Sequence, residues 1–274
     1  MVSAEALILV FVAGLITDLA TGIGAIPFFF VKDFSKKILV GLWGLASGIM
    51  LSASFLGLIP EGIAAAQKYP MFNSAYFAVG LGLILGGILV VVAQRIVDDV
   101  ELDPGTFEEN DFKKMVLILG VLTVHSFPEG VAIGVAFAEM GLASGIPIFG
   151  LAVPAIAITM TVAISIHNIP EGIAISIPFK ASGVSNWKTM GAAIFSSLPQ
   201  PIGAVVAFIF VRQARVFLPV GYGFAAGAMI YLVMTEFIEE AFEEAENIES
   251  SGWPEFITGN LIGLIIMVLL FTFV

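Results

Sequence analysis

Eight long apolar runs, separated by short polar segments, make up almost the whole chain. They lie at residues 5–30, 38–66, 73–97, 114–138, 147–179, 188–211, 216–240 and 254–274. A helix needs about 20 mostly apolar residues to cross the hydrocarbon layer of a bilayer, and each run is long enough. The pattern therefore predicts an all-α polytopic membrane protein, with eight transmembrane helices in a single domain over 1–274 and a lipid bilayer as its surroundings.

Composition agrees with this interpretation and removes several classes of function. Hydrophobic residues are 59% of the 274, charged residues are 12%, and the mean hydropathy is +1.05, whereas soluble domains are about half apolar and a quarter charged. The first run has neither a positively charged start nor a small-residue cleavage site, so we expect it to be retained. The absence of cysteine excludes disulfides and thiolate metal sites. The 11 Lys and Arg residues form no basic patch, so no nucleic-acid partner is expected.

The distribution of lysine and arginine predicts the direction of the helices. Eight of these residues follow odd-numbered runs and three follow even-numbered runs, and loops rich in Lys and Arg stay in the cytoplasm. The larger group is Lys32, Lys36, Lys37, Arg95, Lys113, Lys114, Lys180 and Lys188. We therefore expect a multi-pass protein of the cell membrane with both termini outside the cytoplasm. The acidic segment 98–113, between the third and fourth helices, is then a cytoplasmic loop.

A polar motif interrupts the fourth and fifth runs. It reads HSFPEG from His125 and HNIPEG from His167. His and Glu are four residues apart in each copy, which puts them on one face of a helix. His125 lies eleven residues after Lys114 and His167 thirteen before Lys180, so at about 1.5 Å per residue both lie roughly 17–20 Å from the inner boundary. Two antiparallel helices thus bring both motifs to one level, near the middle of the membrane.

The chemistry of the motif favours a metal ion. Pro128 and Pro170 lack an N–H and should bend their helices, which is tolerated at this depth only where protein or a water-filled cavity covers the bend. Isolated ionised carboxylates are costly here, but two carboxylates beside two imidazoles become favourable when a divalent cation replaces the protons. Two nitrogen and two oxygen ligands suit zinc, and also iron(II), cobalt and manganese.

The alternative is that each His–Glu pair is a hydrogen-bonded element that only fixes helix packing. These two histidines are the only ones in the chain, and both occupy the same place in the repeat. Ionisable groups inside a membrane usually serve function, so metal binding is the favoured interpretation.

At these residues the sequence resembles the prokaryotic branch of the ZIP family of divalent-metal transporters. HSFPEG and HNIPEG match signature motifs of the family's fourth and fifth helices, and the resemblance covers nearly the whole chain. ASGIMLSASFLGLIPEG resembles the second helix, SSLPQPIGA the sixth and GFAAGAMIYLVMTEFIEEA the seventh. The resemblance implies an inverted repeat, in which helices one to three mirror six to eight around helices four and five. It also implies a homodimer that works by elevator-like or rocking motion.

The resemblance implies a set of metal ligands as well. The primary site would be His125, Glu129, His167 and Glu171. Many relatives hold a second metal beside the first, and here its ligands would be Ser126, Asn168, the bridging Glu171 and Gln200 of helix six. Ser126 stands where relatives commonly have Asn, and Gln200 where they have Glu. Because neither carries a charge, a second dication would face its neighbour with little compensation, and we expect one tightly held central ion and a weak second.

Acidic residues elsewhere are candidates either for a place on the ion path or for a structural role. Glu236 matches an acid of the family's seventh helix, and we expect it to be an exit-side ligand. Glu240 follows at helical spacing and is either a further exit-side ligand or part of a solvated helix end. Carboxylates at a helix C-terminus oppose the macrodipole, a cost that a passing cation would relieve. Glu61 is expected to cap a helix or to lie at a solvated surface, with metal capture as the alternative. Asp18 is expected either in a hydrogen bond to a neighbouring helix or on the ion path.

These features favour a carrier, not an enzyme, that takes zinc or a related divalent ion into the cytoplasm as its substrate. An intramembrane metal-dependent hydrolase is the alternative, since hydrolytic zinc sites keep three protein ligands, an open position and a catalytic base. HExxH is absent, however, and no serine stands in a recognisable catalytic arrangement. A metal-sensing or structural membrane subunit would leave the depth of the motifs and their broken helices unexplained.

The orientation can be tested with single cysteines, because the chain has none of its own. A cysteine at Gly105 should react with a membrane-impermeant thiol reagent only from the cytoplasmic side, and one at Ser3 only from outside, because the Lys and Arg bias puts them there. The cysteine-free parent is the control. The reversed pattern of labelling would overturn the orientation.

Overall fold

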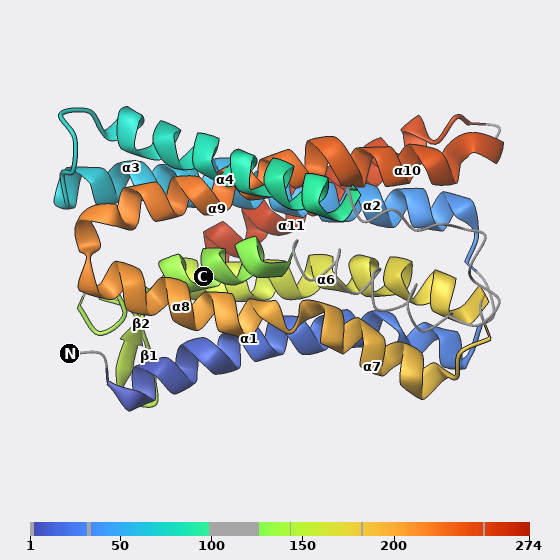
Figure 1. The fold of residues 1–274 in the computed structure, drawn as a ribbon, viewed down its shortest axis with the longest axis horizontal. Coiled ribbons are helices and arrows are strands. Elements are labelled where there is room, and N and C mark those ends of the chain that lie inside the picture. Colours follow the sequence, from blue (N-terminus) through green and yellow to red (C-terminus); the bar gives the residue numbers. More distant parts are fainter. Residues whose placement is uncertain (1–2, 32–33, 99–125, 143, 182, 249) are drawn as a thin grey trace.

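The computed structural model describes residues 3–31, 34–98, 126–142, 144–181, 183–248 and 250–274, and these residues are almost entirely helical (Figure 1). The elements are α1 (Ala4–Gly24), η1 (Ile26–Phe29), α2 (Lys36–Ser52), η2 (Ala53–Leu58), α3 (Ile59–Lys68), α4 (Ala75–Asp98), a helical segment at 126–136, β1 (Ile146–Ile148), β2 (Leu151–Val153), α6 (Ala155–Ala181), α7 (Asn186–Ser197), α8 (Pro199–Gln213), η4 (Arg215–Phe217), α9 (Leu218–Leu232), η5 (Val233–Phe237), α10 (Ile238–Glu244), η6 (Ala245–Asn247) and α11 (Trp253–Phe273).

The predicted spanning helices are present wherever the structure describes them. Seven helical stretches within the described ranges are long and apolar enough to cross a membrane. They are Ala4–Phe29, Lys36–Lys68, Ala75–Arg95, Ala155–Ala181, Asn186–Gln213, Arg215–Glu244 and Trp253–Phe273. The remaining expected span, 114–138, lies outside the described residues as far as residue 125, and its described part is helical from 126 to 136. The acidic segment 98–113 also lies outside them, except for the last residue of α4.

The expected start of the fifth helix at residue 147 is wrong. A two-stranded antiparallel hairpin comes first, with Ile146 opposite Val153, and α6 begins only at Ala155. Phe149 and Gly150, the two residues of its turn, both have positive φ, at 46° and 80°. Two-residue turns of this kind match the twist of a hairpin, so local turn chemistry prevails over the apolar composition of the segment.

Two of the long helices contain a π-helical segment, and a third is broken. η2 lies between α2 and α3, and η5 between α9 and α10. The helix between 186 and 213 changes from α7 to α8 at Leu198, where Pro199 and Pro201 follow. Both prolines lack the N–H that a continuous helix would use, so the break is dictated by the sequence.

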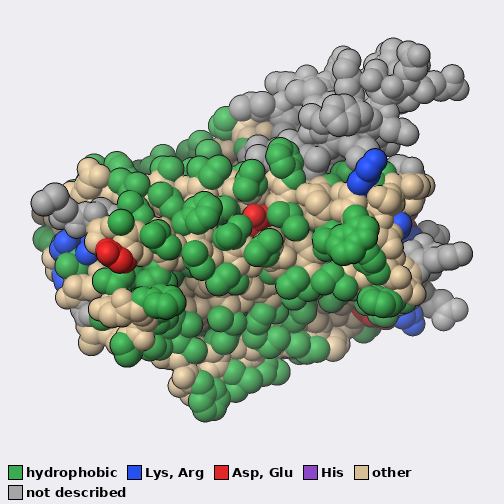
Figure 2. All heavy atoms as spheres, turned by 90° about the horizontal axis from the view of Figure 1, so that it is seen from below, with side chains coloured by type: hydrophobic (Ala, Val, Ile, Leu, Met, Phe, Trp, Pro, Cys, Tyr) green, Lys and Arg blue, Asp and Glu red, His purple; other side chains and the backbone are tan. Residues whose placement is uncertain are grey.

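The helices form two bundles. α1, the segment 126–136, α6, α7 and α8 make the first bundle, and α2, α3, α4, α9, α10 and α11 make the second. Figure 1 shows α1, α7 and α8 on one side of the molecule and α3, α4, α9 and α10 on the other. Hydrophobic side chains cover most of the face in Figure 2, with Lys and Arg near its two ends, as expected for a surface in contact with lipid.

Glycines bring helix backbones into direct contact inside each bundle. In the second bundle, Gly44 and Gly48 of α2 face α11, and Gly82 and Gly86 of α4 face α9. A Cβ on Gly86 would lie 2.0 Å from the carbonyl oxygen of Phe224, so no side chain fits. An inverted repeat exchanges the second helix with the seventh and the eighth with the third. The matching α2–α11 and α4–α9 contacts therefore bear out this architecture.

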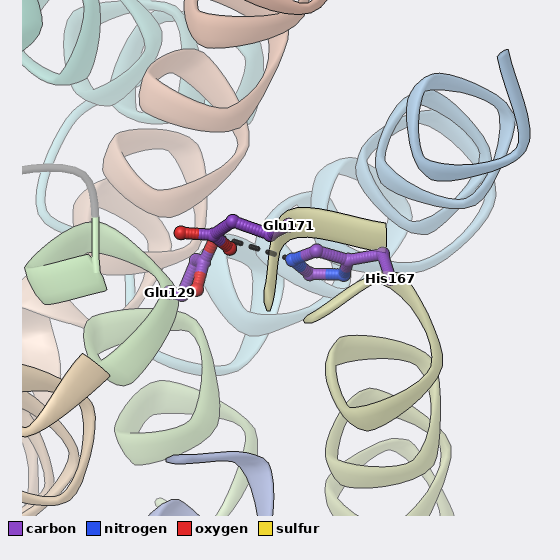
Figure 3. Close-up of side chains that lie close together, drawn as sticks. All are labelled: Glu129, His167 and Glu171. Carbon is purple, nitrogen blue, oxygen red and sulfur yellow. Dashed lines mark hydrogen bonds and ion pairs between the residues drawn. The ribbon is translucent and has the colours of Figure 1, made fainter. Parts of the chain in front are cut away.

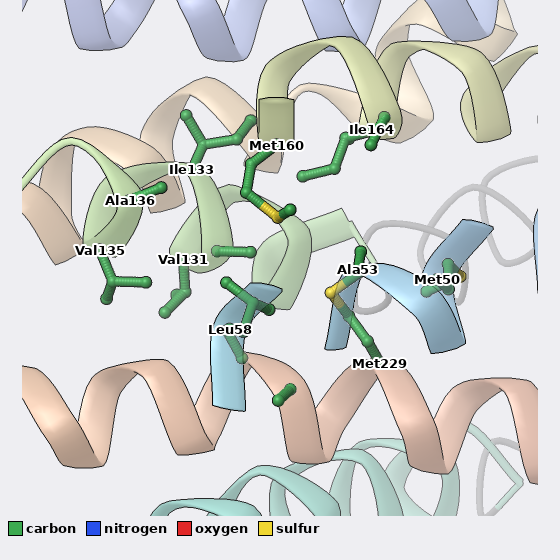
Figure 4. Close-up of a cluster of buried hydrophobic side chains, with 14 of the residues drawn as sticks. Met50, Ala53, Leu58, Val131, Ile133, Val135, Ala136, Met160, Ile164 and Met229 are labelled. Carbon is green, nitrogen blue, oxygen red and sulfur yellow. The ribbon is translucent and has the colours of Figure 1, made fainter. Parts of the chain in front are cut away.

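The two bundles meet through side chains. Met160 of α6 packs in a buried apolar cluster with Leu58 and Met229 of the second bundle (Figure 4). Among the described glycines, none brings the backbone of one bundle against that of the other: Gly57 meets the Cε of Met160, and Gly221 meets a side-chain carbon of Val135. Flexible thioethers adapt to different surroundings, so this interface tolerates displacement better than the glycine contacts within each bundle.

Candidate metal site

Three ionisable side chains meet in the interior of the first bundle. Glu129 comes from the segment 126–136, and His167 and Glu171 come from α6, one turn apart (Figure 3). Each offers a ligand atom, and these atoms all lie within 4.8 Å of one another. All three residues are buried, with exposed fractions of 1%, 0% and 5%. The described residues therefore contain a compact group of one imidazole and two carboxylates, drawn from both copies of the motif.

The proline and glycine of each motif fix this group against neighbouring helices. Pro170 lies inside α6. A Cβ on Gly172 would lie 1.9 Å from the carbonyl oxygen of Thr21 on α1, and one on Gly130 would lie 2.3 Å from that of Gln200 on α8. Only glycine permits this approach. The glycine after each glutamate therefore allows its motif to pack directly on the backbone of another helix of the same bundle.

A network of amides continues from the group. The Nε2 atom of His167 lies 3.1 Å from Oε1 of Glu129, and the side-chain amide of Gln200 donates to the other oxygen of Glu129. Asn168 donates to Oε1 of Gln200 at 3.0 Å and to the carbonyl of Thr17 at 2.8 Å. Gln200 thus compensates the charge of Glu129 as a hydrogen-bond donor, which a glutamate in its place could not do.

Several ligand atoms in this group have no partner among the described residues. They are Nδ1 of His167, Oδ1 of Asn168 and Oε2 of Glu171, all buried. A buried polar group without a hydrogen bond is costly. A divalent cation with nitrogen and oxygen ligands would relieve that cost, so the donor set fits a metal ion.

Two further predicted ligands, His125 and Ser126, stand at the start of the first motif. His125 lies outside the described residues. Ser126 is buried and donates to the carbonyl of Ser196 on α7 at 3.2 Å. Asn168 makes a comparable bond to α1, because each of these side chains follows a motif histidine and donates to a backbone carbonyl of a neighbouring helix.

Glu236 and Glu240 are not part of the compact group. Glu236 lies in η5 and accepts a hydrogen bond of 2.7 Å from Gln94 of α4, which also donates to Thr235. Glu240 lines a cavity of 340 Å³ together with Glu171. Sequence reasoning did not single out Gln94, although an amide within an otherwise apolar run is a signal of a buried partner.

The cavity leads from the group toward one end of the molecule. It is also lined by Trp43 and Glu244. A second cavity of 580 Å³ shares Glu244 with the first and continues to Lys36 and Lys180. Glu171 therefore borders a route that reaches the end of the protein where these lysines lie.

At the opposite end of the molecule, polar contacts join the two bundles. Glu139, in the turn after the segment 126–136, accepts hydrogen bonds from Lys68 at 2.6 Å and from Tyr69 at 2.7 Å. Both partners lie at the end of α3 in the second bundle. Burial acts to raise the pKa of Glu139, but the hydrogen bonds from Lys68 and Tyr69 together lower it below its ordinary value. The contact is therefore present at neutral pH, and it is lost as the pH falls through this lowered pKa.

Of the remaining acids, Glu61 is exposed on α3, as expected. Asp18 is fully buried on α1, and neither of its oxygens has a hydrogen-bond partner among the described residues. The interpretation of Asp18 as part of a hydrogen bond between helices is therefore wrong for the part of the chain that the structure describes.

Known proteins resemble this chain over most of its length. The family model of the ZIP zinc transporters matches residues 103–270, more than half of the chain. The zinc transporter GufA of Myxococcus xanthus is 31% identical over 233 residues, which are 84% of this chain and 87% of that protein. The zinc transporter ZupT of Corynebacterium aurimucosum is 29% identical over 244 residues, 85% of this chain and 87% of that protein. The protein At3g08650 of Arabidopsis thaliana is 37% identical over 229 residues, and this chain spans only 33% of its length.

Proposed function

The chain belongs to the ZIP family of zinc transporters, and from this premise we propose that it carries zinc or a related divalent ion into the cytoplasm through a mid-membrane site on its fourth and fifth spanning helices. Members of this family are multi-pass membrane proteins that transport metal ions and are not enzymes. This excludes the hypothesis of an intramembrane hydrolase. The buried meeting of Glu129, His167 and Glu171 is the observation that supports the site.

His125 is the proposed fourth ligand of the primary site. It stands one residue before the described segment and occupies the same place in its motif as His167. Two imidazoles and two carboxylates would supply two negative charges to a dication, so the loaded site would be neutral. A neutral complex is what a low-dielectric interior accepts at least cost.

A second central ion would have weak ligands. Ser126 donates to a backbone carbonyl, and Gln200 has its amide nitrogen turned toward Glu129. Asn168 can offer Oδ1, and Glu171 would have to be shared with the first ion. We propose one tightly held ion in the centre and a second that is weak.

Release toward the cytoplasm follows the two cavities. Glu240 and then Glu244 would receive the ion from Glu171, and Lys36 and Lys180 lie at the far end, which the Lys and Arg bias assigns to the cytoplasm. Glu236 is held by Gln94 and would contribute to the exit side from the scaffold of the second bundle.

Access from outside would require the contact of Glu139 with Lys68 and Tyr69 to open. It ties the first bundle, which carries the site, to the second at the end opposite the exit cavities. Alternating access would then be a displacement of the first bundle along the side-chain interface of Figure 4. A homodimer, as the family resemblance implies, would hold the second bundle in place.

Metal uptake into sealed proteoliposomes tests the proposed site. His125→Ala, Glu129→Ala, His167→Ala and Glu171→Ala should each remove most zinc uptake and reduce the thermal stabilisation by zinc, because a lost ligand leaves its partners uncompensated. Thr161→Ala, on α6 but with its hydroxyl bonded to the carbonyl of Ala157, is the matched control. Transport at nearly the wild-type rate by both histidine variants would show that the site is misplaced.

Gln200→Glu tests the weak second position. The new carboxylate should raise occupancy of a second ion and destabilise the metal-free protein, because it replaces a donor to Glu129 with a like charge. Metal analysis of the purified protein should give one tight ion per chain in the wild type and nearer two in Gln200→Glu. Two equally tight central ions in the wild type would contradict the charge argument.

The contact of Lys68 with Glu139 can be tested by the accessibility of Leu58, which lies between the bundles. Leu58 is fully buried between the bundles, and Leu58→Cys should react faster with an external thiol reagent when Lys68→Gln is added. The Lys68–Glu139 pair is partly exposed, with side-chain exposures of 51% and 23%, so it is worth up to about 1 kcal/mol and the rate should rise by up to about fivefold. Lys68→Arg keeps the charge and should leave the rate unchanged. An unchanged reaction rate in Lys68→Gln would show that this contact does not limit access from outside.

A further inference from the structure

Asp18 is a buried carboxylate that the metal site does not use. It lies midway along α1, is fully buried, and is not in the compact group of Glu129, His167 and Glu171. Both of its oxygens lack a hydrogen-bond partner among the described residues. A carboxylate in this position is strongly disfavoured unless something positive accompanies it.

The contacts of α1 show what Asp18 faces. Gly14 and Gly22 lie one turn before and one turn after it on the same face of the helix. A Cβ on Gly14 would lie 2.6 Å from the Cα of Pro201 on α8, and one on Gly22 would lie 2.5 Å from a side-chain carbon of Ile194 on α7. Asp18, between them, therefore faces the break between α7 and α8, where Ser197 ends α7.

The groups at this break are oxygen acceptors and hydroxyls. Thr21, one turn from Asp18 on α1, has its hydroxyl 2.7 Å from that of Ser197, and both are buried. Pro201 has no N–H to donate to the Ser197 carbonyl four residues earlier. The end of α7 is the negative end of one helix dipole, and the start of α8 is the positive end of another. Pro199 and Pro201 lack two of the N–H groups that the first turn of α8 would otherwise present there, and Asp18 has no hydrogen-bond donor among the described residues.

No described lysine or arginine of the first bundle is placed to neutralise Asp18. Lys188 lies in the first turn of α7, and Arg212 lies near the end of α8, where it donates to the carbonyls of Ala138 and Met140. Both are more than two turns of helix from the break, and Lys180, in the last turn of α6, donates to the carbonyl of Val184 and to the side chain of Asn186. The charge of Asp18 can therefore be compensated by a bound cation or removed by a proton.

We propose that Asp18 binds a hard monovalent cation of the sodium type, between α1 and the break from α7 to α8. The carboxylate of Asp18, the hydroxyls of Thr21 and Ser197 and the Ser197 carbonyl would supply a set of oxygen ligands only. Hard cations prefer such a set, whereas zinc favours nitrogen and sulfur. A single positive charge balances the single carboxylate, and the carbonyls of broken membrane helices coordinate sodium in other transporters.

The absence of an acceptor at hydrogen-bond distance from Asp18, among the described residues, favours an ion over a proton. A protonated carboxyl would donate to an acceptor at hydrogen-bond distance, and the described residues provide none to Asp18. Oxygens that share a cation at about 2.3–2.6 Å lie around it and need not be within hydrogen-bond reach of one another. Asp18, which has no such acceptor among the described residues, fits the second case.

The sodium site would communicate with the metal site through α1. The carbonyl of Thr17, the residue before Asp18, accepts a hydrogen bond from Asn168, and Asn168 also donates to Gln200. A cation that pulls α1 onto the break would hold these amides in position beside Glu129. Sodium binding itself does not depend on the proposed transport and can be measured without zinc.

The test compares thermal unfolding of the purified full-length protein in sodium chloride and in choline chloride at equal concentration, without zinc. Wild-type Tm should rise by several degrees as sodium replaces choline, because an ion that binds only the folded state stabilises it by mass action. Asp18→Asn keeps the size of the side chain and removes its charge. This variant should lose the sodium response and should be at least as stable as the wild type in choline. Ser197→Ala, which removes one ligand, should weaken the response.

Thr189→Val is the matched control, because Thr189 is also buried on α7, with a hydroxyl that has no partner among the described residues, but lies more than two turns from the break. It should keep the full sodium response. Equal Tm values in sodium and choline for the wild type would overturn the proposal, as would a sodium response that persists in Asp18→Asn. A wild-type Tm that follows pH but not sodium would assign the carboxyl a proton. Loss of zinc uptake in the metal-site variants, with the sodium response intact, would leave this proposal standing.

Discussion

The membrane interior offers no water to a charged group, and this constraint determines how the first bundle is built. Glu129 is buried beside His167 and accepts a hydrogen bond from Gln200, which in turn accepts one from Asn168, and Glu171 is buried next to the same imidazole. These partners come from α6 and α8, and Glu129 comes from the segment 126–136, so three elements must be held in fixed positions. The glycine of each motif does this, since it seats the motif directly on the backbone of α1 or α8. Charge compensation and close helix packing are thus two parts of one requirement.

The contacts inside each bundle are more rigid than the contacts between the two bundles. Inside each bundle, backbones touch at glycines, and a shift of one helix would produce a steric clash. Between the bundles, methionine, leucine and valine side chains meet, and these can exchange partners at little cost. The described hydrogen bonds among Glu129, His167, Asn168 and Gln200 all lie within the first bundle, so a displacement of that bundle need not break them.

Much of the fold could be predicted from the sequence, because membrane helices follow from the length of apolar runs. The apolar runs marked seven spans that the structure describes, and the repeated motif identified Glu129, His167 and Glu171 as neighbours. What could not be predicted depends on contacts far apart in the chain. Glu139 meets Lys68 across 71 positions, and Gln94 reaches Glu236 across 142; neither pair leaves a local pattern. The hairpin before α6 was missed because its turn residues lie inside an apolar segment.

The π-helical segment η2 allows the orientation of α3 to change without a change in the packing of α2. Six residues, Ala53–Leu58, lie between the part of α2 whose glycines contact α11 and the part of α3 that carries Lys68 and Tyr69. One residue more or less in a helix turns everything beyond it by about 100°. A deletion of a single residue within η2 would thus leave α2 seated on α11 and turn the end of α3 away from Glu139. Insertions and deletions at this point could therefore alter the contact of Lys68 and Tyr69 with Glu139 in evolution while the packing of α2 on α11 is kept.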